Sequence, residues 1–129
     1  MTVPLGSPRV LGLAAAPGAT TLYTLVHDDS AVIRVIDVLT LTVTGSIDRP
    51  DTGTSFSDAA SVLVSPDGSH LYIGHTRGVT EVDTATHKVR RTFSWEDGSY
   101  FTSLTVSSDS AFLYGGASEK AVQFNLVTS

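Results

Sequence analysis

Apolar and polar residues alternate over short stretches of this chain, and each stretch is bounded by residues that favour turns. Residues 79–83, Val-Thr-Glu-Val-Asp, show the alternation and predict a strand with two unlike faces. No stretch sustains apolar residues at helical spacing, and residues 58–64, which come nearest to it, are too few for a helix. The pattern therefore predicts an all-β chain of short strands and tight turns.

These predicted strands recur as a repeated unit. Residues 13–23, 62–72 and 104–114 align without gaps, and each segment ends in a Leu-Tyr pair at spacings of 49 and 42 residues. A further strand follows each pair and ends at Asp37, Asp83 or Asn125. In the first two repeats a turn and a fourth strand come next, at residues 41–47 and 88–95. Four strands in a period of this length are typical of a β-propeller blade.

The turns of the second repeat carry specific signals. In Ser65-Pro66-Asp67-Gly68, proline presets its own φ and glycine tolerates a positive φ, so a tight turn is expected between the first two strands. Asp83 precedes Thr84-Ala85-Thr86, and its carboxylate is expected to close the turn between the third and fourth strands. Both signals indicate antiparallel hairpins.

The second repeat also resembles a known family. Its segments Val-Ser-Pro-Asp-Gly-Ser-x-Leu-Tyr-Ile at 64–73 and Val-Asp-Thr-Ala-Thr-x-Lys-Val-x-x-Thr-Phe at 82–93 are similar to the YVTN-type repeat of surface-layer and lactonase-like β-propellers. The other two repeats match more loosely, and the resemblance extends over residues 10–129. It implies blades but no particular activity, because similar blades occur in enzymes, electron-transfer subunits, DNA-associated proteins and cell-surface proteins.

The repeats predict a single partial propeller domain. Residues 10–57 form a first blade, 58–101 a second, and 102–129 a third that lacks its outermost strand, while residues 1–9 form an extended segment that includes a possible closing strand at 2–5. Propellers close with four or more blades, so three are too few. We therefore expect completion by another chain, either a second copy in a six-bladed ring or a complementary propeller chain. A fragment of a longer propeller is the third alternative.

Composition and charge narrow the classes of partner. Hydrophobic residues make up 41% and charged residues 16%, as in a packed globular chain, and the absence of cysteine excludes disulfides, thiolate metal sites and cysteine nucleophiles. The net charge of −5 and the scattered arginines, with Arg90 and Arg91 as the one adjacent basic pair, argue against binding to nucleic acid or an anionic membrane. The first residues lack the pattern of a signal peptide, which suits a cytoplasmic protein and equally a mature piece of an exported one.

The resemblance implies that the second-to-third and fourth-to-first strand connections gather on one face, where propeller ligands bind. These connections contain histidines, acids, arginines and the one tryptophan of the chain. They predict a surface for a polar ligand or a partner, made of His27, Asp28, Arg49, His75, Arg77, Trp95 and Tyr100. The alternative is that these are the ordinary polar turns of a β protein.

We find no pattern that assigns catalytic residues, a cofactor or a metal site. The four histidines lack the spacing of metal ligands, Asp28-Asp29 lacks the rest of a calcium loop, and no Gly-x-Ser-x-Gly motif is present. The sequence therefore favours a non-enzymatic propeller module that binds or scaffolds. The alternatives are an enzyme or enzyme subunit of the lactonase-like type and a ring-forming short-chain lectin, although Trp95 has no counterpart in the first or third repeat.

Overall fold

The computed structural model describes residues 9–15, 18, 20–27, 31–47, 61–75, 78–94, 101–117 and 120–127. Regular structure in these residues consists of strands, which form three antiparallel sheets in the orders β1-β2-β3-β4, β5-β6-β7-β8 and β11-β10-β9. The strands are β1 (Arg9–Ala15), β2 (Thr21–His27), β3 (Ala31–Asp37), β4 (Thr42–Ile47), β5 (Ser61–Val64), β6 (His70–His75), β7 (Gly78–Asp83), β8 (Val89–Ser94), β9 (Phe101–Val106), β10 (Phe112–Ala117) and β11 (Lys120–Asn125).

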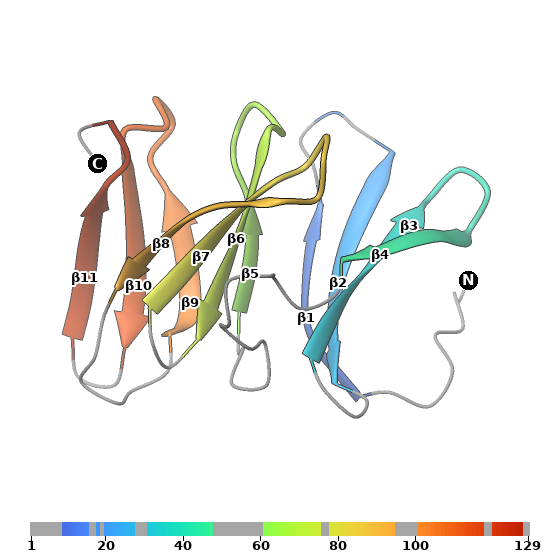
Figure 1. Ribbon diagram of the computed structural model, residues 1–129, viewed down its shortest axis with the longest axis horizontal. Helices are drawn as coiled ribbons and strands as arrows, with labels where there is room; N and C mark the ends of the chain where they lie inside the picture. Colours follow the sequence, from blue (N-terminus) through green and yellow to red (C-terminus); the bar gives the residue numbers. More distant parts are fainter. Residues whose placement is uncertain are drawn as a thin grey trace.

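The three sheets stand side by side and pack face to face, as blades do (Figure 1). We call them the first, second and third blades in chain order. The strands that begin the blades, β1, β5 and β9, contact one another in turn. The predicted all-β fold of four-stranded blades is confirmed, and the third blade has three strands in the described part of the chain. The predicted closing strand at residues 2–5 lies outside the described residues.

The predicted turns form as expected. Gly68 adopts a φ of +77° and its amide donates to the Ser65 carbonyl at 2.9 Å. The Asp83 carboxylate accepts hydrogen bonds from the amides of Ala85 and Thr86 at 2.8 and 3.1 Å, which closes the turn between β7 and β8. These local bonds satisfy amides that the strands leave unpaired.

The core lies in the two seams between adjacent blades. In the second blade, Leu71, Ile73 and Val82 belong to the apolar cluster shared with the first blade, whereas Tyr72 and Phe93 belong to the cluster shared with the third. Both faces of the second blade are therefore buried. Complete burial of one such large apolar side chain is worth about 1.5–3 kcal/mol.

The described residues contain no helix that is long and apolar enough to cross a membrane.

Strand β7 shows the effect of this double packing. The sequence predicts two unlike faces there, yet every residue from Gly78 to Val82 is buried, including the polar Thr80 and Glu81. The neighbouring blades cover both faces of the central sheet, so a polar side chain of β7 is buried on whichever face it lies. Glu81 thus becomes a buried carboxylate.

Candidate functional site

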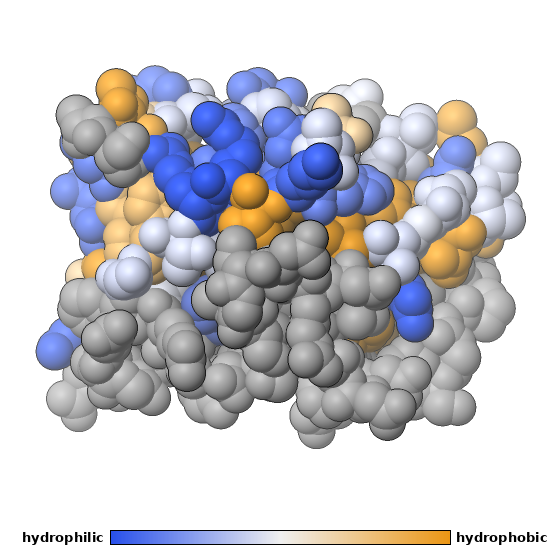
Figure 2. Space-filling view, viewed as in Figure 1, coloured by the Kyte–Doolittle hydropathy of each residue, from blue (hydrophilic) through white to orange (hydrophobic). Residues whose placement is uncertain are grey.

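A polar pocket lies between the second and third blades, at the edge where the turns between first and second strands lie. We call it the interblade pocket. Figure 2 shows strongly hydrophilic residues gathered along this edge of the molecule. The pocket has a volume of about 300 Å³ and is lined by Asp67, His70, Tyr72, Glu81, Arg90, Arg91, Ser110, Leu126 and Val127.

The strand register of the second blade aligns the main polar residues. Tyr72 on β6 pairs with Glu81 on β7, and Glu81 pairs with Arg91 on β8. The register then shifts, because the next pair is Val82 with Val89, which makes Arg90 the extra residue of a β-bulge. A bulge places two residues opposite one on the facing strand. Both arginines therefore reach the Glu81 carboxylate.

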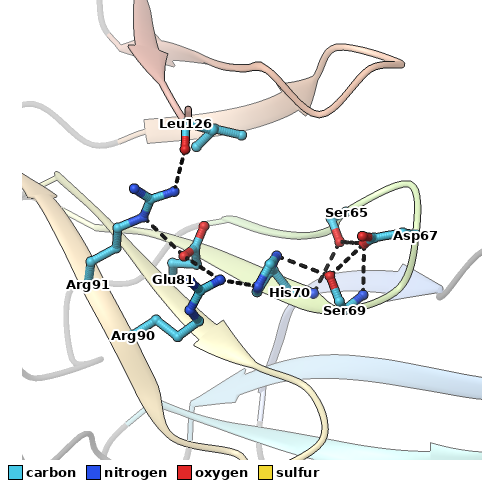
Figure 3. A network of polar contacts seen from close by, with 8 residues as sticks. All are labelled: Ser65, Asp67, Ser69, His70, Glu81, Arg90, Arg91 and Leu126. Atoms are coloured by element: carbon cyan, nitrogen blue, oxygen red, sulfur yellow. Dashed lines mark hydrogen bonds and ion pairs between the residues drawn. The ribbon is translucent and has the colours of Figure 1, made fainter. Parts of the chain in front are cut away.

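Glu81 is the centre of this network (Figure 3). Its Oε1 accepts a hydrogen bond from Nε of Arg91 at 3.1 Å and lies 3.6 Å from Nη1 of Arg90. The Glu81 side chain is 1% exposed, and its Oε2 has no hydrogen-bond partner among the residues that the structure describes. Oε2 is enclosed, with less than 1 Å² of its surface exposed, and the Tyr72 phenol is hydrogen-bonded to the same carboxylate.

Arg91 connects the two blades. Its Nη2 donates to the Leu126 carbonyl, in the segment after β11, at 2.8 Å. Its guanidinium also lies over the Phe93 ring, 4.7 Å from the ring centroid, and Phe93 in turn packs on Phe124 of the third blade. A cation over an aromatic face and a charged hydrogen bond both hold the guanidinium in place. Arg91 is therefore held in place between the second and third blades.

The rim of the pocket is ordered by hydrogen bonds around Asp67. Its Oδ1 accepts from the hydroxyls of Ser65 and Ser69 at 2.7 and 2.6 Å and from the Ser69 amide at 3.0 Å, and these bonds hold the pKa of the Asp67 carboxyl well below its usual range. His70 contacts Nη1 of Arg90 through Nε2, and its Nδ1 lies 3.1 Å from the Ser69 hydroxyl. The ring of His70 thus links the turn that contains Asp67 to Arg90.

Tyr72 contributes a phenol to the pocket wall. Burial raises the pKa of Tyr72 above its ordinary value, and the charge of the neighbouring Glu81 carboxylate and a side-chain hydrogen bond to that carboxylate raise it further. Tyr72 therefore stays protonated at neutral pH and offers an O–H group. The pocket presents two carboxylates, two guanidinium groups and neutral hydroxyls, an array suited to hydrogen bonding with a small molecule. No group of three or more potential metal ligands occurs among the described residues.

Most of the residues that the sequence predicts as a binding surface cannot be placed. Asp28, Arg49, Arg77, Trp95 and Tyr100 lie outside the described residues, and the side chain of His27 does as well. His75 is buried on β6, where its Nε2 lies 2.8 Å from the Thr80 hydroxyl. The binding surface on that face stays a prediction.

The interblade pocket was not expected from the sequence. The adjacent arginines at 90 and 91 and the acid at 81 were visible as single features, but nothing local indicates that they meet. Two signals exist in hindsight: Glu81 lies in a central strand, and two arginines follow on the next strand at hairpin distance. Leu126 belongs to another blade, so its role depends on how the blades pack.

Comparison with known proteins supports the architecture. No protein-family model and no curated protein matches the chain. Among solved structures, Kuenenia stuttgartiensis hydrazine synthase superimposes with a TM-score of 0.77 at 18% identity, over 98% of this chain and 35% of that one. The structure of U3-55K superimposes with a TM-score of 0.83 at 15% identity, over 98% of this chain and 38% of that one.

Both solved structures are β-propellers, and the chain spans little more than a third of either. At these identities the likeness shows the fold alone. The described part of the chain is thus a partial β-propeller.

Proposed function

We propose that this protein is a non-catalytic β-propeller module that completes its ring with the blades of another chain and serves as a binding scaffold. A second copy of the chain is the favoured source, because two sets of three blades make a six-bladed ring. The observation that carries the proposal is the exposure of two blade faces whose counterparts inside the molecule are covered.

The first blade exposes a face that corresponds to faces buried in the second and third blades. Leu13 occupies the repeat position of Val62 and Leu104, which pack in the two seams, yet the Leu13 side chain is 60% exposed. Val43 occupies the position of Val89, which packs in the first seam, and it is 44% exposed. A further blade would bury this surface.

The third blade exposes its other face, the one that in the first and second blades packs against the blade that follows. Tyr114 occupies the position of Tyr23 and Tyr72, which are 6% and 2% exposed, whereas Tyr114 is 37% exposed. The same face has the same residue types beside the tyrosine as the second blade has, because the pair Ser103 and Gly116 occupies the positions of the pair Ser61 and Gly74. The third blade thus offers the surface that a first blade of a second copy would cover, and the contact repeats until a ring closes.

The test is the mass of the native protein in solution, measured by light scattering after size exclusion. We expect a dimer for the wild type and a shift toward monomer for Leu13→Glu and for Tyr114→Glu, because a buried unpaired charge opposes association. Leu39→Glu is the matched control, since Leu39 is 77% exposed in the turn between β3 and β4. A stable, folded monomer of the wild type would overturn the proposal.

We further propose that the partner or ligand binds on the face formed by the second-to-third and fourth-to-first strand connections. The support is their composition, with His27, Asp28, Arg49, Arg77, Trp95 and Tyr100 in or beside them. His75, which the sequence predicts for the same surface, is buried on β6. Combined replacement of Arg49, Arg77 and Trp95 by alanine is expected to abolish capture of a purified partner. Thr86→Ala, on a turn between third and fourth strands, is expected to leave capture unchanged.

A further inference from the structure

The faces that the blades turn toward the blade that follows become less apolar along the chain. In the first blade, Ile33 and Val35 lie on this face and are buried in the first seam. The third blade has Ala121 and Gln123 at the same positions relative to the repeated tyrosine. Both are exposed on the open face of the third blade, which thus lacks the aliphatic side chains that fill the first seam.

The open face of the third blade instead carries hydrogen-bonding groups. Thr105, Tyr114 and Gln123 form a row across β9, β10 and β11, and Nε2 of Gln123 donates to the Tyr114 hydroxyl at 3.1 Å. Thr105 occupies the position of Leu63, which packs in the second seam. Hydroxyl and carboxamide oxygens are hydrogen-bond acceptors. This face therefore offers acceptors where an internal seam has apolar groups.

The open face of the first blade carries a cation that the same position lacks in the other blades. Arg34 stands in a row with Leu13 and Thr24, as paired across β1, β2 and β3. The equivalent residues are Thr80 in the second blade and Val122 in the third. The Arg34 side chain is half-buried, and it forms no ion pair within the part of the chain that the structure describes. A partner that covers this face must therefore accept hydrogen bonds from a guanidinium.

The two open faces are complementary in this respect. A guanidinium has only donors, and it is the cation that suits protein interfaces best because it is weakly hydrated. The second seam contains a precedent, since Nη2 of Arg91 crosses from the second blade to the Leu126 carbonyl of the third at 2.8 Å. An arginine that reaches a neutral oxygen of the neighbouring blade is thus already part of this molecule.

The polarity of the two faces also determines how strongly they associate. Burial of apolar area is the main favourable term when protein surfaces meet, whereas a hydrogen bond exchanged with water adds little net free energy. A seam that has Ala121 and Gln123 in place of Ile33 and Val35 buries less apolar area than the first seam does. The contact that closes the ring is therefore weaker than the contacts inside one chain.

We propose that the open face of the third blade docks on the first blade of a second copy through hydrogen bonds that Arg34 of that copy donates, and that this polar seam makes the ring a reversible assembly. The proposal rests on the ring of two copies proposed above and specifies how that ring closes.

The first test is analytical ultracentrifugation of the full chain over a range of concentrations. We expect the wild type to sediment as a dimer at about 100 µM and to dissociate on dilution toward about 1 µM, the range of a weak interface. Ala121→Ile with Gln123→Val, which transplants the residues of the first seam, is expected to tighten the dimer by about tenfold or more.

The second test is a charge change at Gln123, which is exposed in the separate chain. Gln123→Glu is expected to tighten the dimer and Gln123→Lys to weaken it, each by about fivefold or more, because Arg34 of the other copy is close. With Arg34→Thr, which introduces the residue type of Thr80, the two changes should differ by less than about twofold. Ala85→Lys is the matched control, since Ala85 is exposed in the turn between β7 and β8 and adds the same charge.

The outcomes separate this proposal from the ring itself. A wild-type dimer that persists far below about 1 µM would overturn the reversible seam and leave the ring in place. A difference between Gln123→Glu and Gln123→Lys that is absent, or that survives in Arg34→Thr, would overturn the contact with Arg34. A wild type that stays monomeric at every concentration would overturn both proposals, and the polar face would then be the solvent-facing end of the blade array.

Discussion

Glu81 and Arg91 face each other across β7 and β8, and the Nε of Arg91 donates to Oε1 of Glu81 at 3.1 Å. Arg91 also bonds to the Leu126 carbonyl, so this pair joins the middle of the second blade to the end of the third. One arginine thus stabilises both a buried carboxylate and the seam between two blades. The first prediction follows from this double role.

Arg91→Ala is expected to lower the free energy of unfolding by about 3 kcal/mol, because it removes the closest cation from the buried Glu81 carboxylate and leaves the Leu126 carbonyl without its donor. Arg90→Ala is the control on the same bulge. Arg90 is half exposed and its Nη1 is 3.6 Å from Glu81, so its loss is expected to cost below about 1 kcal/mol. Urea unfolding at pH 7 and moderate salt measures both, and equal effects of the two changes would contradict this assignment.

Acid should weaken the turn at Asp67. Hydrogen bonds from Ser69 and Ser65 lower the pKa of the Asp67 carboxyl below its ordinary value of 3.8. A lowered pKa in the folded state means that the stabilisation is complete above the unfolded value and is lost as the pH falls below it. We expect the thermal midpoint to fall as the pH drops below about 5, and to fall less in Asp67→Asn. A pH profile identical in both proteins would contradict this role.

Alkali should act through the buried tyrosines. Burial raises the pKa of Tyr72 and of Tyr23 above the ordinary value of 10.0. Because the unfolded phenols ionise first, the stabilisation is complete below pH 10 and decreases as the pH rises from there toward the folded value. We expect a steeper loss of stability above pH 10 in the wild type than in Tyr72→Phe. The prediction would be contradicted if Tyr72 ionised in the folded protein near pH 10. Tyrosinate absorbance would then rise before unfolding in the wild type, and this rise would be missing in Tyr72→Phe.

Replacing Ser110 by glycine should relieve backbone strain in the third blade. Ser110 has a φ of +59° at the repeat position where the second blade has Gly68, with a φ of +77°. A left-handed conformation costs a non-glycine residue about 1–2 kcal/mol, partly offset by the greater freedom of glycine in the unfolded chain. Ser110→Gly is expected to raise stability by about 0.5 kcal/mol, and Gly68→Ser to lower it by about 1 kcal/mol. Chemical denaturation measures both, and effects of the opposite sign would contradict the explanation.

The blades were predictable because their signals are local. The Leu-Tyr pairs, the Ser-Pro-Asp-Gly turn and the closing Asp83 all act within one hairpin, and each forms the expected structure. The predicted fourth strands at 41–47 and 88–95 agree with β4 and β8 to within about one residue.

The interblade pocket was not predictable in the same way. It depends on the bulge that makes Arg90 an extra residue, on the enclosure of β7 between two blades, and on a carbonyl at Leu126, 35 residues beyond Arg91. The residues close to Glu81 in the sequence indicate none of these three features. An acidic residue in a strand usually points toward solvent, and only the neighbouring blade makes this one buried.

The sequence by itself determined the units of this protein: short antiparallel strands, the turns that join them and the number of repeats, because hydrogen bonds and side-chain alternation act over a few residues. The tertiary structure decided what those units enclose. Packing of one blade on the next turned Glu81 into a buried carboxylate, gave it Arg90 and Arg91 as partners, and left Leu13 and Tyr114 exposed on the two open faces. Burial and charge pairing are properties of surfaces that meet, so they follow from the arrangement of the blades and not from any one of them.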